Sequence, residues 1–219
     1  MPPVDLLAFV RGALPPPPAR ILEIGAGGGE LAAELRGAGY AVHAVDPAAE
    51  SGSGVERATL LEVAGTFDAA LAVVSLHHVE PLDESCAHLA TLMRPAALLV
   101  IDEFDVTRLD ERAAEWWLGQ RRALGVVEEH DAAGLIAFMR GHVHPLPAVL
   151  EALQPFFALA EPVRGAYLHR WSLETGLRDV EERLIAKGTL PATGARLVTA
   201  RRSSTADLGE ERRSTQPRA

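Results

Sequence analysis

Residues 20–46 read RILEIGAGGGELAAELRGAGYAVHAVD and decide the fold. The stretch begins with a buried-strand pattern at 20–24, passes through a glycine-rich turn at 25–29, and continues with helical spacing to residue 38. A second strand pattern follows at 40–45. Strand, turn, helix and strand in about 30 residues form a βαβ unit. Such a unit requires a parallel sheet and a right-handed crossover.

The residues around this unit continue the alternation of strands and helices. The run at 67–75 predicts a buried strand, 81–94 a helix and 96–101 another strand. Residues 4–14 predict a short leading helix that ends at the prolines of 15–18, because proline has no amide hydrogen to continue it. The alternation predicts an α/β fold with a doubly wound, mainly parallel sheet.

The second half of the chain departs from this alternation. Residues 105–124 and 131–140 predict two helices with no strand between them, and we interpret 105–144 as a helical cap or insertion. The elements expected after the cap are a helix at 147–153, a strand at 157–163, a helix at 173–186 and a strand at 195–200. We therefore expect a single domain over residues 1–200 and a disordered tail over 201–219.

Composition narrows the class of protein. With 219 residues, 48% of them hydrophobic, the chain is long enough for one sizeable core. Its formal charge of −9 disfavours a nucleic-acid partner. The single cysteine, Cys86, forms no internal disulfide, and no apolar run approaches the roughly 20 residues of a membrane span. We expect a cytoplasmic protein without a membrane partner; the oligomeric state is left open.

The glycine turn suits a ligand that approaches the backbone closely. Glycines permit positive φ angles, and free amides at the start of the following helix favour electron-rich groups. Asp46 ends the second expected strand, where a carboxylate accepts hydrogen bonds from both ribose hydroxyls. These features predict an adenosine-containing cofactor. A dinucleotide fingerprint needs a third glycine where Glu30 stands, so an NAD(P)-dependent oxidoreductase is the less favoured alternative.

Three motifs in order resemble those of class I S-adenosylmethionine-dependent methyltransferases. Counted from Glu23, an acidic residue is followed by glycines at alternate positions, like the first motif of that family. Residues 67–83, FDAALAVVSLHHVEPLD, are similar to the fourth-strand motif of its small-molecule members, which reads FD…LHH. Residues 92–104, LMRPAALLVIDEF, are similar to its L-x-P-G-G turn and fifth strand, with alanines replacing both glycines.

The resemblance covers residues 20–104 and implies a Rossmann-like sheet of about seven strands, with S-adenosylmethionine as cofactor. It also implies methyl transfer to a small-molecule acceptor. The cofactor-binding residues that it implies are Glu23, Gly25, Ala26, Gly27, Asp46, Pro47, Thr59, Leu60, Ser75, Leu76 and His77.

One departure from the family pattern concerns residues 47–66. The family fits a helix, a strand and a loop between its second and fourth strands, and this interval is too short for all three. We therefore expect one crossover element to be missing, which leaves the adenine contacts least certain. A non-catalytic, cofactor-binding module is the corresponding alternative function.

Methyl transfer is an in-line displacement, in which an enzyme supplies alignment and, for acceptors that lose a proton, a base. The candidate catalytic residues are Glu103, His78 and His142. The first two follow expected strands at the edge where open α/β sheets bind ligands. Candidates for the acceptor pocket are His144, Tyr167, His169 and Trp117. A metal site built from these histidines is disfavoured, and none is predicted.

Arginines offer one further kind of contact. Arg121, Arg122, Arg164 and Arg170 are candidates for pairing with a carboxylate or phosphate on the substrate, because a guanidinium binds such groups with two parallel hydrogen bonds. Solvated surface charge is the commoner role for most arginines.

Overall fold

The computed structural model describes residues 4–173 and 176–203. Its first half contains α1 (Val4–Ala13), β1 (Arg20–Ile24), α2 (Glu30–Gly37), β2 (Ala41–Val45), β3 (Phe67–Val73), α3 (Leu82–Leu92) and β4 (Met93–Phe104). Its second half contains α4 (Glu111–Ala123), α5 (Ala132–His142), α6 (Leu146–Leu153), β5 (Phe157–Ala158), β6 (Val163–Gly165), α7 (Arg178–Ala186) and β7 (Gly194–Arg201). Short 3₁₀ turns lie at η1 (Leu60–Glu62), η2 (Leu76–His78), η3 (Val106–Arg108) and η4 (Leu168–Arg170).

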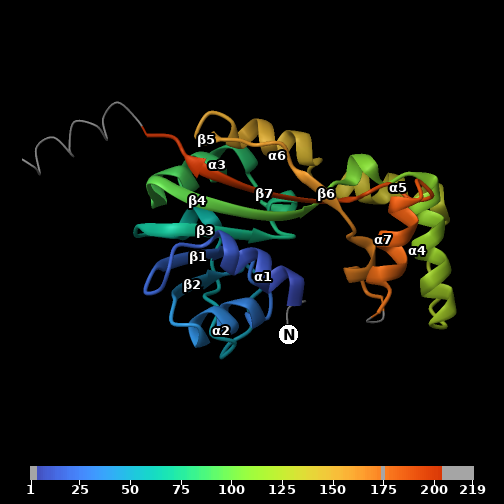
Figure 1. Cartoon of the computed structure of the whole chain (residues 1–219), viewed down its shortest axis with the longest axis horizontal. Helices are drawn as coiled ribbons and strands as arrows, with labels where there is room; N and C mark the ends of the chain where they lie inside the picture. Colours follow the sequence, from blue (N-terminus) through green and yellow to red (C-terminus); the bar gives the residue numbers. More distant parts are fainter. Residues whose placement is uncertain (1–3, 174–175, 204–219) are drawn as a thin grey trace, which may run out of the picture.

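The strands form one seven-stranded mixed sheet (Figure 1). Its order is β2-β1-β3-β4-β7-β5, and β6 also pairs with β7. The pairs among β2, β1, β3 and β4 are parallel. β7 runs against its neighbours β4, β5 and β6, so the remaining strands all point one way. The doubly wound, mainly parallel α/β fold predicted from the sequence is therefore confirmed.

Helices cover both faces of the sheet, which explains why its inner strands are apolar throughout. Neighbouring residues of β1 point to opposite faces: Ile21 packs with α1 and α2, and Leu22 packs with α3 and α6. In β4, Val100 lies on the same side as Ile21, and Leu99 lies on the same side as Leu22. The cores on the two sides of the sheet hold the carboxyl ends of β1, β3 and β4 in fixed positions.

The connection between β2 and β3 is short, as the sequence predicts. The described residues there form η1 and one isolated parallel bridge, between Val45 and Glu56. The Arg36 side chain donates to the carbonyl oxygens of Val42 and Gly54, which ties this segment to the outer edge of β2. The Arg36 side chain and the segment between β2 and β3 thus cover the outer edge of β2, which would otherwise be open to pairing with another strand.

Three expected elements differ from the structure. The helix expected at 173–186 begins only at residue 178, as α7. The strand expected at 157–163 is divided into β5 and β6, because Pro162 lies between them and has no amide hydrogen for the sheet. The helix expected over 105–124 is a 3₁₀ turn followed by α4, because the Asp105 and Asp110 side chains accept backbone hydrogen bonds and begin separate turns.

A helical lobe lies at one end of the sheet, beyond β6 (Figure 1). It contains α4 and α5, which lie within the range 105–144 interpreted as a cap, and also η4 and α7, which lie outside that range. Its core is aromatic, with Trp117 and Trp171 stacked at 4.4 Å between ring centroids and Phe104 and Tyr167 at 4.8 Å. Of the tail expected at 201–219, residues 204–219 lie outside the described part of the chain.

Candidate active site

A cavity of about 410 Å³ opens at the carboxyl ends of β1, β2 and β3. This is the edge at which parallel α/β sheets bind ligands, and the volume lies within the range of small-molecule sites. The cavity is lined by Ile24, Gly25, Val45, Asp46, Pro47, Ala58, Thr59, Leu60, Val74, Ser75, His78, Val79 and Glu80.

The glycine turn forms one wall because Gly25 lies directly against Ser75. The Gly25 amide donates to the Val45 carbonyl at 2.9 Å, and its φ angle is 67°. A Cβ atom at position 25 would come within 2.4 Å of the Ser75 Cβ atom, which is closer than any real packing allows. A side chain would therefore push apart the two segments that form this wall.

Asp46 lines the same cavity and is held by backbone donors. Its Oδ2 atom accepts from the Gly27 amide at 2.9 Å, and its Oδ1 atom accepts from the Ala48 amide at 2.8 Å. A carboxylate has about four acceptor positions, so these bonds leave capacity on both oxygens. That capacity fits a pair of ribose hydroxyls, the role predicted for Asp46 from the sequence.

Glu23 lies beneath the glycine turn as a buried carboxyl, only 3% exposed. Its Oε2 atom has no hydrogen-bond partner. Burial raises its pKa to about 7; Arg36 opposes this rise and Glu30 adds to it. A buried acceptor without a donor fits a ligand that brings a hydrogen-bond donor or a cationic group. Glu23 is not among the residues that line the cavity itself.

The short turn η1 contributes Thr59 and Leu60 to the cavity lining, two of the cofactor-binding residues that the resemblance implies. Glu62 fixes this turn, because its carboxylate accepts from the Thr59 amide at 2.7 Å and from the Thr59 hydroxyl at 2.8 Å. These hydrogen bonds hold the pKa of Glu62 below its usual value. The Glu62 side chain therefore caps η1 rather than remaining a purely solvated charge.

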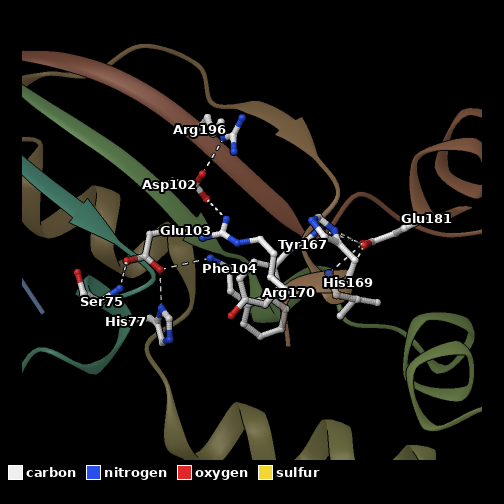
Figure 2. A network of polar contacts seen from close by, with 11 residues as sticks. Ser75, His77, Asp102, Glu103, Phe104, Tyr167, His169, Arg170, Glu181 and Arg196 are labelled. Carbon is white, nitrogen blue, oxygen red and sulfur yellow. Dashed lines mark hydrogen bonds and ion pairs between the residues drawn. The ribbon is translucent and has the colours of Figure 1, made fainter. Parts of the chain in front are cut away.

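Glu103 is fully buried and holds the segment after β3 in place (Figure 2). Its Oε1 atom accepts from the amides of Ser75 and Leu76, at 2.8 and 2.7 Å. Its Oε2 atom contacts the His77 Nδ1 atom. Both oxygens are thus engaged by the protein, which favours a positioning role over the direct proton transfer expected from the sequence.

The two adjacent histidines differ in their surroundings. His77 is 4% exposed against Glu103 and does not line the cavity, whereas His78 is exposed and lines it. Their ring centroids lie 4.2 Å apart. Partial burial, then the neighbouring His77, lowers the pKa of His78, and Glu103 opposes this effect. His78 is therefore a neutral imidazole near pH 7, able to accept a proton.

The other predicted site residues are dispersed. Trp117 and Tyr167 lie in the aromatic core of the lobe, and burial raises the pKa of Tyr167. His142 is exposed at the end of α5 and stacks on Phe138. His144 contacts Glu80 at 2.8 Å, beside the cofactor cavity. Among the described residues, no three histidine, cysteine or acidic side chains are placed to hold a metal ion.

Of the predicted cofactor-binding residues, Gly25, Asp46, Pro47, Thr59, Leu60 and Ser75 line the cavity. Glu23, Ala26, Gly27, Leu76 and His77 do not. Sequence reasoning missed Val79 and Glu80, which directly follow the LHH motif and extend its wall. It also missed Ile24 and Val45, whose signal is that each is the last residue of a strand at the ligand-binding edge.

A family model described as a methyltransferase domain matches residues 3–142. The chain therefore belongs to this family of methyltransferases. It is an S-adenosylmethionine-dependent methyltransferase, so the class I methyltransferase predicted from the motifs is confirmed, whereas the small-molecule type indicated by the FD…LHH motif stays a prediction.

Solved structures share the fold at low sequence identity. An S-adenosylmethionine-dependent methyltransferase from Mesorhizobium loti is 18% identical, with a TM-score of 0.56 over 90% of this chain and 96% of that one. The 1,6-didemethyltoxoflavin-N1-methyltransferase of Burkholderia thailandensis, solved with S-adenosylhomocysteine, is 19% identical, with a TM-score of 0.51 over 91% and 76%. A Thermotoga maritima methyltransferase, described as a possible histamine N-methyltransferase, is 15% identical, with a TM-score of 0.54 over 90% and 87%. No curated protein matches the chain.

The residues present fit S-adenosylmethionine, the cofactor of the family. The cavity is large enough, Gly25 opens its wall, Asp46 has acceptor capacity and Glu23 carries an unpartnered buried oxygen. When bound, this cofactor supplies a methyl group on a positively charged sulfur. In the described part of the chain, no helix is long and apolar enough to cross a membrane.

Proposed function

We propose that the protein transfers the methyl group of S-adenosylmethionine to a small-molecule acceptor, with His78 as the group that takes a proton from it. The observation that carries this proposal is the shared wall of the cavity. Gly25, Asp46 and the His78 imidazole border the same space, so the cofactor residues and a neutral base face one another.

The preference for a small-molecule acceptor rests on the net charge of the chain and on its similarity to a solved methyltransferase. A chain with a formal charge of −9 is poorly suited to the phosphate backbone of nucleic acids. The Burkholderia thailandensis neighbour was solved with 1,6-didemethyltoxoflavin bound, and it has the same fold.

The chain's own residues supply alignment and proton acceptance. Glu103 holds the amides of Ser75 and Leu76, and thereby fixes the direction in which His78 leaves the turn. An acceptor whose hydroxyl, amine or carbon acid loses a proton would transfer it to a neutral imidazole at that place. Because the pKa of His78 is lowered, the base form predominates at neutral pH.

The test is a screen of phenol, amine and carbon-acid acceptors, read by formation of S-adenosylhomocysteine. We expect turnover with one class, and a value of kcat/KM that rises through a pKa below the ordinary histidine value and then stays level. His78→Gln should lose this rise and at least tenfold in kcat/KM, whereas His130→Gln, at an exposed position in the lobe, should not. Cofactor binding without turnover of any acceptor would instead support the non-catalytic alternative.

A further inference from the structure

Val74, the first residue after β3, has an unfavourable backbone conformation at the wall of the cofactor cavity. Its φ angle is 55°, in the left-handed region. The other described residues with a positive φ angle are glycines, apart from Ala96 and Ser172, so Val74 is the only one among them that is branched at Cβ. A β-branched side chain fits this region poorly. Valine at this position therefore costs stability that a glycine would not cost.

Two consecutive residues of β4 hold the backbone of Val74 and of the residues that follow it. The Val74 amide donates to the Asp102 carbonyl oxygen at 2.8 Å. The next two amides, those of Ser75 (Figure 2) and Leu76, donate to the Glu103 Oε1 atom at 2.8 and 2.7 Å. Backbone strain persists only where the surroundings fix the chain in this way, and it concentrates at functional sites.

The Val74 side chain makes contacts that a glycine could not make. It lines the cofactor cavity, together with Ser75 and His78 of the following turn. It is also packed against the aromatic core of the lobe, and among the described residues that line the cavity it is the only one grouped with that core. Val74 is therefore the point at which the lobe core meets the wall of the cofactor cavity.

We propose that Val74 is a positioning residue of the methyl-transfer site, because its left-handed backbone and its packing against the lobe fix the direction in which residues 75–78 leave β3. These residues bring Ser75 and His78 to the cavity wall. A turn that is fixed before the ligand arrives lowers the cost of ordering the protein on binding. The inference rests on the proposed function only in placing the cofactor in this cavity, and its test measures binding without turnover.

Alanine and glycine at position 74 separate the effect of the backbone from that of the side chain. Val74→Ala keeps the unfavourable φ angle and loses two methyl groups, whereas Val74→Gly loses the side chain and also relieves the backbone. We expect Val74→Gly to unfold at a higher urea concentration than Val74→Ala. In calorimetry it should nevertheless bind S-adenosylhomocysteine about fivefold more weakly than Val74→Ala, because a freer backbone must be ordered on binding. A residue that served stability alone would rank the two variants in the same order in both measurements.

Val74→Thr serves where circular dichroism shows that the two smaller variants do not fold. Threonine keeps the branched shape of valine and adds a hydroxyl, which lowers stability in a packed site. We expect Val74→Thr to unfold at a lower urea concentration than the wild type and to bind S-adenosylhomocysteine within about twofold of it. The matched control is Val127, which is 92% exposed, has no positive φ angle and does not line the cofactor cavity. Val127→Gly should be no more stable than Val127→Ala, and both should bind S-adenosylhomocysteine as the wild type does.

Equal or tighter binding of S-adenosylhomocysteine by Val74→Gly than by Val74→Ala would overturn the inference and leave the cofactor site in place. The same holds if Val74→Gly is no more stable than Val74→Ala, since position 74 would then carry no strain, or if the affinity of Val74→Thr falls together with its stability. No binding to the wild type would contradict the proposed function itself, and the inference with it.

Discussion

Two turns of the molecule, residues 75–78 and 167–170, have the same construction and serve different places (Figure 2). We name them the cofactor turn and the lobe turn. Their sequences are SLHH and YLHR. In each, a buried glutamate accepts from the first two backbone amides and contacts the histidine Nδ1 atom. The first residues even share backbone angles, with φ of −136° at Ser75 and −139° at Tyr167.

The glutamates come from different supports. Glu103 belongs to β4, in the middle of the sheet, whereas Glu181 belongs to α7, in the lobe. The fourth residue of each turn also differs: His78 lines the cofactor cavity, and Arg170 pairs with the buried Asp102 of β4. A turn held by a buried glutamate thus fixes the position of its fourth residue in both places. The elements around the turn determine what that residue contacts.

The largest expected effect is that of Glu103→Gln on the cofactor turn. An amide oxygen can accept from the Ser75 and Leu76 amides, but the amide nitrogen cannot accept the His77 proton that Oε2 now faces. We expect the free energy of unfolding to fall by about 3 kcal/mol, because a buried hydrogen-bond network is broken. S-adenosylhomocysteine should bind at least tenfold more weakly in calorimetry. Unchanged affinity in a folded variant would refute the role of Glu103 in shaping the cavity.

Glu181→Gln tests the lobe turn, and we expect it to cost about 2 kcal/mol in urea unfolding. Affinity for S-adenosylhomocysteine should stay within twofold, because none of the lobe-turn residues lines the cofactor cavity. An equal loss of affinity in the two glutamine variants would show that the turns are coupled.

The stability of Glu181→Gln should depend on pH differently from that of the wild type. Burial would raise the pKa of Glu181, but hydrogen bonds from His169 and from the turn amides outweigh it and lower the pKa. Because the pKa of Glu181 is lower in the folded state, its ionised form stabilises the folded protein at pH values above the ordinary pKa of 4.5. This stabilisation is lost as the pH falls through the folded-state pKa. Wild type should therefore lose stability on acidification below pH 4.5, and Glu181→Gln should lack this part of the loss.

Glu23 is the contrasting case, a buried carboxyl whose Oε2 atom lacks such donors. Its pKa is raised to about 7, so its protonated form is favoured in the folded state. Its contribution to stability is complete below the unfolded pKa of 4.5 and is lost as the pH rises through about 7. Between pH 5 and 8, wild type should lose about 2 kcal/mol relative to Glu23→Gln. Parallel stability curves for the two proteins would contradict this account.

The smallest expected effect uses Cys86 as a reporter. Its thiol is buried in the same core as Leu76, and burial, with a contribution from Asp83, raises its pKa to about 12. A thiol-reactive dye should label it only when the sheet core opens. Glu181→Gln should leave the labelling rate close to that of wild type, whereas Glu103→Gln should increase it. Equal acceleration in both variants would mean that the lobe and the sheet open together.

The first half of the fold was predictable because its signals are local. β1 lies at residues 20–24 as expected, since an apolar run buried on both faces and followed by a glycine turn has few alternatives. The strand expected at 157–163 shows the limit of this reasoning. Its apolar run ends at residue 160, and Glu161 and Pro162 interrupt it, so the expected strand is divided into β5 and β6.

The site was predictable where a residue's position along a strand determines its place. Asp46 and Gly25 line the cavity because each follows a strand at the ligand-binding edge. The roles of Glu103 and His77 were not predictable, because they depend on the direction in which each side chain points and on a contact between residues 26 positions apart in the sequence. Trp117 and Tyr167 suit a pocket or a core equally well by composition, and only packing places them in the lobe core.

The placement of the cofactor in the cavity beside Asp46 can be tested by calorimetric titration of S-adenosylhomocysteine into the wild type, Asp46→Ala and Glu84→Ala. The last variant removes an exposed acid in the first turn of α3, away from the cavity lining. We expect the wild type and Glu84→Ala to bind with equal affinity, and a folded Asp46→Ala to bind at least tenfold more weakly. No binding to the wild type, or equal binding to all three proteins, would contradict the placement of the cofactor in this cavity.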